Sequence, residues 1–170
     1  MTITSIAFDL DDTLLDTSRI LIPVAGTPEF ESLIGKPLPL MPGAKDNLES
    51  LKNKYRLFLV TQGDQKVQNQ KIASLGIESY FREIYVAKAV PADAKRECFS
   101  KIFSTHHLLP QQMLAIGNRR SSEIRQAKKL GAWTCLMHHG EHINEPIEEP
   151  EDIPDFEIFN HQQLIKICQL

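Results

Sequence analysis

The sequence lacks the features of a membrane protein, of a secreted protein and of a nucleic-acid-binding protein. No apolar run approaches the roughly 20 residues that a membrane helix requires. The N-terminal stretch has no basic region and is interrupted by Asp9, so we expect no signal peptide. The net charge is −3, which gives no reason to expect nucleic acid or a membrane surface as a partner.

Cysteines are also few. The three cysteines, Cys98, Cys135 and Cys168, are far apart and have no metal-ligand spacing. Free and mostly buried thiols in a reducing compartment are the simpler interpretation, and we therefore expect a cytoplasmic protein. With 170 residues, of which 42% are hydrophobic, the chain fits one globular domain, 1–170, with a sizeable core.

Short apolar runs alternate with longer helical patterns along the chain. The predicted strands are residues 5–8, 56–60, 83–87, 113–116 and 132–137. The predicted helices are residues 44–53, 65–75, 94–105 and 121–130, with 161–170 as a further candidate. This alternation predicts an α/β fold, a Rossmann-like three-layer sandwich whose open, mostly parallel sheet has helices on both faces. In such sheets the ligand crevice lies beyond the carboxyl ends of the strands.

Two segments do not follow this alternation. Residues 18–40 contain several prolines and two glycines without a sustained period, which predicts a loop with one helical turn at most. Residues 141–157 hold eight acidic residues and no lysine or arginine. This composition favours a solvated acidic loop, which leads to the terminal strand and helix, over a partner-binding segment.

Polar side chains follow the first two predicted strands. Asp9 and Asp11 lie two residues apart, so extended backbone would place their side chains on one face. Two carboxylates this close repel each other unless a cation compensates them, and Mg²⁺ favours such oxygen ligands. An acidic turn that only ends the strand is an equally simple interpretation of this pair alone. Thr61 follows the second strand, where its hydroxyl group could bind an anion or merely cap the next helix.

The remaining candidates lie after the later strands. Asn118 and Glu123 lie beyond the fourth strand and offer an amide oxygen and a carboxylate. Two lysines are candidates for a cation in the crevice. Lys88 immediately follows the third strand, and Lys95 opens the next helix.

In this order, the candidates resemble the four motifs of the haloacid dehalogenase-like (HAD) superfamily. The first family motif is Asp-x-Asp-x-Thr after a hydrophobic strand, and residues 8–13, Phe-Asp-Leu-Asp-Asp-Thr, match it fully. The second motif ends at Thr61, the lysine motif is at Lys95, and the fourth comprises residues 114–118 with Glu123. The resemblance spans about residues 3–170 and is interrupted mainly at 18–40.

The sequence departs from the family pattern in the third and fourth motifs. Asn118 and Glu123 stand where the family usually has two aspartates, and the lysine lacks the common Lys-Pro signature. Lys95 is the preferred motif lysine because it begins a helical stretch with apolar residues on one face. Lys88 is the alternative.

The resemblance implies a Mg²⁺-dependent phosphatase. Asp9 would attack phosphorus and form an aspartyl-phosphate, which water then hydrolyses, and Asp11 would act first as acid and then as base. Thr61 and Lys95 would hold the phosphoryl oxygens. The implied metal ligands are Asp9, Asp11 through its backbone carbonyl group, Asn118 and Glu123. Asp11 also favours a phosphatase over a dehalogenase, because a halide leaving group needs no proton.

Residues 18–40 stand where capped members of the family insert a domain of several helices, and they are too few to form one. We therefore expect no sizeable cap domain and an open site. An open site suits a large phosphorylated substrate. The alternative is that a neighbouring subunit of a homo-oligomer covers the site. The alternative function is a catalytically weakened member that serves as a binding or regulatory protein. Asn118 favours that alternative, because an amide brings no charge to a metal site.

Overall fold

The computed structural model describes residues 2–91 and 93–170. Its centre is a six-stranded sheet in the order β3-β2-β1-β4-β5-β6, and all neighbouring strands are parallel. The strands are β1 (Ser5–Phe8), β2 (Arg56–Gln62), β3 (Glu83–Ala87), β4 (Met113–Gly117), β5 (Trp133–Met137) and β6 (Phe156–Ile158). The predicted Rossmann-like fold is confirmed, and the sheet is fully parallel.

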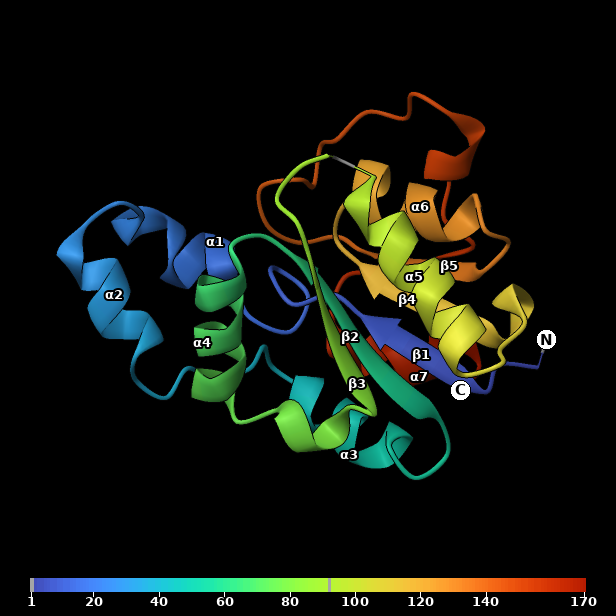
Figure 1. Cartoon of the computed structure of the whole chain (residues 1–170), viewed down its shortest axis with the longest axis horizontal. Helices are drawn as coiled ribbons and strands as arrows, with labels where there is room; N and C mark the ends of the chain where they lie inside the picture. Colours follow the sequence, from blue (N-terminus) through green and yellow to red (C-terminus); the bar gives the residue numbers. More distant parts are fainter. Residues whose placement is uncertain (1, 92) are drawn as a thin grey trace.

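Helices cover both faces of this sheet (Figure 1). One face carries α3 (Ala44–Leu51), α4 (Gln65–Leu75) and α7 (Leu164–Cys168), and the other carries α5 (Ala94–Thr105) and α6 (Arg125–Lys128). Strand β1 shows why the sheet is apolar on both faces. Ile6 and Phe8 join the core under α3, α4 and α7, whereas Ala7 joins the core under α5 and α6.

The direction of the strand order reverses at β1. Strands β2 and β3 extend the sheet on one side of β1, and β4, β5 and β6 extend it on the other. At such a switch point the connections after two neighbouring strands leave in opposite directions and open a crevice. Asp9 directly follows β1 and Asn118 directly follows β4, so the two polar segments meet at this crevice.

The remaining elements are short. The structure has single turns of 3-10 helix at η1 (Ile22–Val24), η2 (Glu78–Tyr80), η3 (Pro110–Gln112), η5 (Pro150–Asp152) and η6 (His161–Gln163). A π-helical turn, η4 (Arg120–Ile124), precedes α6, where we predicted one regular helix over 121–130. Such π-helical turns are frequent at functional sites.

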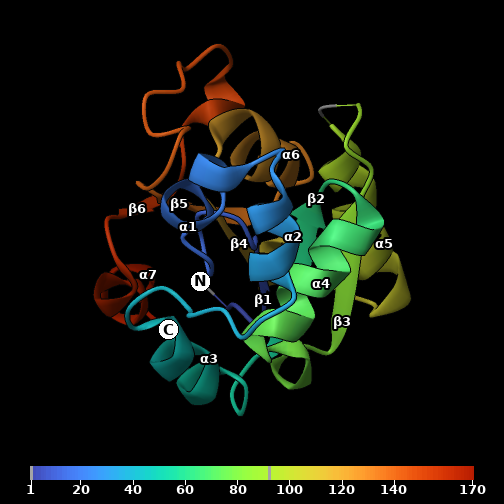
Figure 2. The ribbon, with the colours of Figure 1, turned by 90° about the vertical axis from the view of Figure 1, so that its left-hand side faces the viewer.

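The prediction of a loop over residues 18–40 was wrong. The segment holds most of α1 (Thr17–Ile20), the turn η1 and the helix α2 (Pro28–Ile34). These short helices bury a small apolar cluster of their own, centred on Leu15, Leu21 and Ile34, which also contacts Leu75 of α4. In both views α2 stands beside α4 (Figures 1 and 2). Helices of this length are too short to show a sustained hydrophobic period in the sequence.

The acidic segment 141–157 is anchored by ion pairs, although we predicted a solvated loop. Arg125 of α6 donates from Nε to Asp152 Oδ1 at 2.6 Å and from Nη2 to Glu148 at 3.0 Å. Asp152 is fully buried, and hydrogen bonds from Arg125 lower its pKa to about 2. The cations that hold this segment come from elsewhere in the chain, so its own composition could not reveal them.

No helix within the described ranges, 2–91 and 93–170, is both long and apolar enough to cross a membrane. Cys135 and Cys168 are buried and Cys98 is half-buried, and all three are free thiols, as predicted.

His161 joins the C-terminal turn to the loop after β1. Its Nε2 donates to the backbone oxygen of Thr13 at 2.7 Å, and the Asn47 side-chain amide lies 3.2 Å from its Nδ1. Asn47 also donates to the His161 backbone oxygen at 2.7 Å. Burial lowers the pKa of His161 below its ordinary value of 6.5. In the folded protein the imidazole ring of His161 is therefore neutral, and its Nδ1 faces the amide group of Asn47.

This buried ring predicts a loss of stability in acid. Because the unfolded chain binds the proton first, the contribution of His161 is complete above about pH 6.5 and is lost as the pH falls below that value. The slope approaches about 1.4 kcal/mol per pH unit. Urea unfolding at a series of pH values should show a smaller slope in His161→Gln, whereas His107→Gln, at an exposed position, should behave like the wild type. Equal slopes in all three proteins would contradict the prediction.

Candidate active site

One pocket of about 470 Å³ lies beyond the carboxyl ends of β1, β2 and β4. The predicted site residues that line it are Asp9, Asp11, Thr61, Lys95, Asn118 and Glu123. They come from four separate stretches of the chain. The structure thus brings the complete predicted set together, whereas their individual roles stay predictions.

A buried ion cluster forms the floor of the pocket. Lys95 Nζ lies 2.5 Å from Asp9 Oδ1 and also donates to Glu123. The side chains of Lys95 and Asp9 are only 3% and 5% exposed. Burial raises the pKa of Asp9 to about 7, Lys95 opposes this shift, and Glu123 and Asp11 add to it. Burial alone would lower the pKa of Lys95, but the two carboxylates hold it above its ordinary value.

Glu123 reaches this cluster because β4 ends in glycine. A Cβ atom at Gly117 would lie 2.3 Å from the Glu123 Cγ, so only glycine leaves room for this side chain. One Glu123 oxygen accepts from Lys95, and the other accepts from the backbone N–H of Arg119 at 3.0 Å. Both oxygens therefore have protein partners, so Glu123 holds Lys95 in place, and its role as a metal ligand stays a prediction.

Asp11 lies beside Asp9 and is held by three side chains. Thr17 Oγ1 and Lys71 Nζ donate to Oδ1 at 2.5 and 2.7 Å, and Gln68 Nε2 donates to Oδ2 at 3.0 Å. Burial acts to raise the pKa of Asp11, but the charge of Lys71 and the three hydrogen bonds lower it below its ordinary value. The sequence patterns pointed to none of these three partners.

Thr61 presents an unsatisfied hydroxyl group to the pocket. We predicted that Thr61 directly follows the second strand, but it is the penultimate residue of β2. Its Oγ1 is buried and has no hydrogen-bond partner among the described residues. A buried hydroxyl without a partner costs free energy, and because Thr61 lines the pocket, a bound ligand would supply that partner.

Asn118 faces the pocket from the end of β4. Its amide nitrogen donates to the backbone oxygen of His139 at 3.2 Å, which leaves the amide oxygen on the other side of the group. This contact ties the fourth motif to the segment after β5. The alternative lysine, Lys88, is exposed and lines a separate pocket of about 710 Å³ between β3 and α5. The structure therefore favours Lys95 as the lysine of the site.

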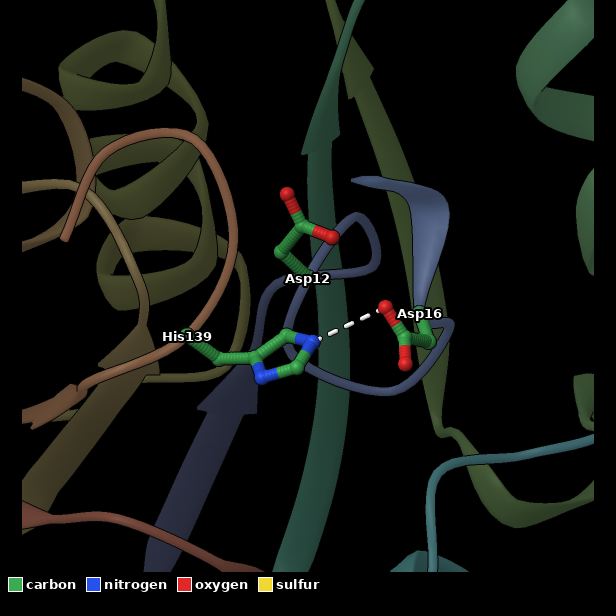
Figure 3. A group of neighbouring side chains, drawn as sticks. All are labelled: Asp12, Asp16 and His139. Carbon is green, nitrogen blue, oxygen red and sulfur yellow. Dashed lines mark hydrogen bonds and ion pairs between the residues drawn. The ribbon is translucent and has the colours of Figure 1, made fainter. Parts of the chain in front are cut away.

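A second group of carboxylates supports the loop after β1 (Figure 3). His139 Nε2 lies 2.9 Å from Asp16 Oδ1, and Asp12 lies close to both. Asp12 has a positive φ of 53°, which is uncommon for a residue other than glycine. Its carboxylate accepts from the backbone N–H and the hydroxyl group of Ser18 at 2.8 and 2.5 Å. A Cβ atom at Gly140 would lie 2.1 Å from an Asp12 oxygen. This group holds the loop after β1, the start of α1 and the segment after β5 together.

The rim of the pocket is partly apolar, and no cap domain formed by residues 2–91 and 93–170 lies over it. From residues 17–40, Thr17 and Ile22 are the pocket-lining residues among those described. Val90, which is 76% exposed, faces the same pocket from the connection after β3. Glu141 and His142 complete the rim from the acidic segment.

The architecture agrees with a known family. Residues 29–137 match the family of haloacid dehalogenase-like hydrolases. Because this match covers more than half of the chain, the chain belongs to that family. Asp9 and Asp11 precede the matched residues, so what they do is inferred from the structure around them.

Individual proteins show the same likeness. The glyceraldehyde 3-phosphate phosphatase of Methanopyrus kandleri is 25% identical over 116 residues, which are 68% of this chain and 50% of the relative. The chain spans about half the length of the curated relatives it matches. The magnesium-bound crystal structure of YfnB, a Bacillus subtilis protein assigned to the HAD hydrolases, has a TM-score of 0.74 at 19% identity and covers 100% of both chains. A HAD phosphatase from Thermococcus onnurineus has a TM-score of 0.70 at 17% identity, over 96% of this chain and 97% of that one. These structures show the fold.

Proposed function

We propose that the protein is a phosphatase that hydrolyses a phosphate monoester through an aspartyl-phosphate on Asp9. The observation that carries the proposal is the pocket floor, where a buried aspartate lies 2.5 Å from a buried lysine and beside an unsatisfied threonine hydroxyl group. Lys95 and Thr61 supply a cation and a donor for phosphoryl oxygens, and Asp9 supplies a nucleophile. Relatives that are named as phosphatases support the same reaction class.

In the first step, an Asp9 carboxylate oxygen forms a bond to phosphorus while the bond from phosphorus to the leaving oxygen breaks. Asp11, in its protonated form, gives its proton to that oxygen and becomes the carboxylate. In the second step, Asp11 takes a proton from a water molecule, which attacks phosphorus and releases phosphate from Asp9. Lys95 and Thr61 hold the phosphoryl oxygens in both steps, so the chain mainly positions groups and offsets charge.

The residues of the pocket fit a divalent cation. Burial and two neighbouring carboxylates raise the pKa of Asp9 to about 7, and a bound cation would offset this cost. Asp9, the backbone carbonyl group of Asp11 and the amide oxygen of Asn118 would hold Mg²⁺, which prefers oxygen ligands. When bound, Mg²⁺ neutralises charge on the phosphoryl group. Glu123 would act indirectly through Lys95.

The second candidate function is a weakened family member that binds a ligand without turnover. Asn118 is the observation that favours it, because an amide lowers the negative charge around the cation. Turnover of an aryl phosphate by the wild-type protein, measured with and without Mg²⁺, separates the two functions. Mg²⁺-dependent hydrolysis supports the phosphatase, and its absence on a broad panel of phosphate monoesters supports the binding protein.

Asn118→Asp is expected to tighten Mg²⁺ binding. The added charge attracts the cation, and a tenfold lower half-saturating concentration corresponds to about 1.4 kcal/mol. Activity should therefore rise when the metal is subsaturating. Titration of Mg²⁺ against turnover for the wild type and the variant measures the shift. Coincident curves would mean that Asn118 does not contact the metal.

The substrate of the proposed phosphatase is expected to have a leaving group with apolar surface. The described part of the chain places no cap domain over the pocket, and Ile22 and Val90 expose apolar side chains at its rim. This open rim admits a large phosphorylated substrate. A neighbouring copy of the chain in a homo-oligomer could cover it instead.

A further inference from the structure

Helix α4 contributes a buried cation to the active-site pocket. Lys71 Nζ lies 2.7 Å from Asp11 Oδ1, and its side chain is 7% exposed. Lysine is rarely buried, because removing an ammonium group from water costs free energy unless an anion compensates it. Among the ion pairs of the described residues, Asp11 is the partner of Lys71. The position of this lysine is therefore tied to the pocket.

The neighbouring turn of α4 holds the other side of the same carboxylate. Gln68 Nε2 donates to Asp11 Oδ2 at 3.0 Å and to the backbone oxygen of Gln62 at 3.2 Å. Gln68, Lys71 and Ile72 are the buried residues of α4 and share one helix face. Ile72 enters the core of the sheet, whereas the two polar side chains reach the site. The polar part of the buried face thus serves Asp11.

We propose that Lys71 is a positioning residue for Asp11: together with Gln68, it fixes the orientation of the carboxyl group that exchanges protons with the leaving oxygen and with water. This inference rests on the proposed function only for the role of Asp11. The side chain of Asp11 stays 28% exposed, so the held carboxyl group still reaches the pocket. Proton transfer requires a donor–acceptor distance of about 2.6–3.2 Å, and small displacements cost much of the rate.

Helices α1 and α4 meet around the same carboxylate. Thr17 at the start of α1 donates to the oxygen that Lys71 contacts. One turn further along α4, the backbone oxygen of Ser74 accepts from the N–H of Leu38, beyond the end of α2. Helix α4 is thus bonded both to Asp11, through Lys71 and Gln68, and to the segment after α2, through Ser74. A positioning residue requires support of this kind from the element that carries it.

The kinetic experiment compares Lys71→Met with Lys71→Arg. Methionine keeps the apolar stem and removes the charge. We expect Lys71→Met to lower kcat about tenfold to hundredfold, which is part of the roughly 10²–10⁴-fold that an acid–base group contributes. KM should change little, and an alkyl phosphate should lose more than an aryl phosphate, whose leaving group needs less protonation. Lys71→Arg should recover part of kcat, and Lys66→Met, an exposed lysine of the same helix, should retain full activity.

A double-mutant cycle separates positioning from other roles. In the Asp11→Asn background, Lys71→Met should cost little further activity, because the group that it positions is already gone. A full additional loss in that background would overturn the proposal. So would a raised KM with unchanged kcat, which would make Lys71 a substrate-binding residue. Thermal unfolding of each variant identifies any loss that comes from the fold alone.

A crystallographic comparison tests the proposal without activity. In Lys71→Met, the Asp11 carboxyl group should turn away from its wild-type orientation, whereas in Lys66→Met it should keep it. An unchanged Asp11 side chain in Lys71→Met would overturn the positioning role. If the wild type hydrolyses no phosphate monoester with Mg²⁺, the proposed function fails, and the orientation of Asp11 still decides the role of Lys71.

Discussion

Asp9→Asn is expected to abolish phosphate hydrolysis and to leave the fold intact. The amide keeps the shape of the side chain but cannot form the bond to phosphorus. Removal of a nucleophile lowers kcat by something on the order of 10⁴–10⁶-fold in enzymes that form covalent intermediates. The fold should persist because Lys95 keeps Glu123 as a counter-ion, and because the backbone N–H of Asp9 still donates to Ile116 at 2.9 Å.

The measurement is turnover of an aryl phosphate at saturating Mg²⁺, with circular dichroism and thermal unfolding as tests of the fold. Asp46→Asn, at an exposed position of α3, is the matched control and should keep wild-type activity. Incubation with substrate followed by acid quenching should trap phosphate on the wild-type protein and not on Asp9→Asn. Wild-type turnover by the purified Asp9→Asn protein would refute the mechanism.

Much of the sheet could be predicted from the sequence because its central strands, β1 and β4, are buried along their whole length. Such strands appear in the sequence as continuous apolar runs: the predicted range 5–8 coincides with β1, and the predicted range 113–116 lies within β4. The site candidates followed from the same property. In a parallel sheet the carboxyl ends of all strands lie at one edge, so residues far apart in the chain were expected to meet there.

The partners of Asp11 could not be predicted, because they depend on how α4 packs against the loop after β1. Lys71 and Gln68 look like ordinary polar residues of an amphipathic helix. One signal was present: they lie at helical spacing, i and i+3, beside the apolar Ile72. Polar residues on an otherwise buried helix face are uncommon, and where they occur they indicate a buried partner.

The contacts of the acidic segment were hidden for a related reason. Its cationic partners, Arg119 and Arg125, lie outside the segment, just before η4 and at the start of α6. The composition of the segment alone could therefore only predict a solvated loop. Arg119 contacts Glu145 and Arg125 contacts Asp152. Arg119 directly follows Asn118, and Arg125 begins α6. The ion pairs tie the segment that forms part of the rim to the turn and helix that follow Asn118. Charge pairing between distant segments emerges only in the folded chain.

Lys95→Met is expected to lower both activity and stability. Lys95 is the cation that lies between the buried carboxylates of Asp9 and Glu123. Its removal leaves two carboxylates without a counter-ion, and breaking a buried ion pair in this way costs about 3–5 kcal/mol. Phosphoryl oxygens also lose the charge that would offset their own, so hydrolysis should fall by at least about a hundredfold. Glu123 would no longer have a group to orient.

The pH dependence of that loss identifies its cause. Without Lys95, which opposes the upward shift of the Asp9 pKa, the folded-state pKa of Asp9 rises further above its unfolded value. In this pH range the unfolded chain then binds fewer protons than the folded protein, so a rising pH favours unfolding of the variant. The free energy of unfolding of Lys95→Met should therefore fall further below that of the wild type at about pH 8 than at about pH 5.5. Lys88→Met, which alters an exposed lysine in a separate pocket, should match the wild type in stability and turnover. If Lys88→Met loses activity and Lys95→Met retains it, Lys88 is the lysine of the site. A pH-independent deficit in Lys95→Met would mean that the methionine disrupts packing and does not expose the two carboxylates to their mutual repulsion.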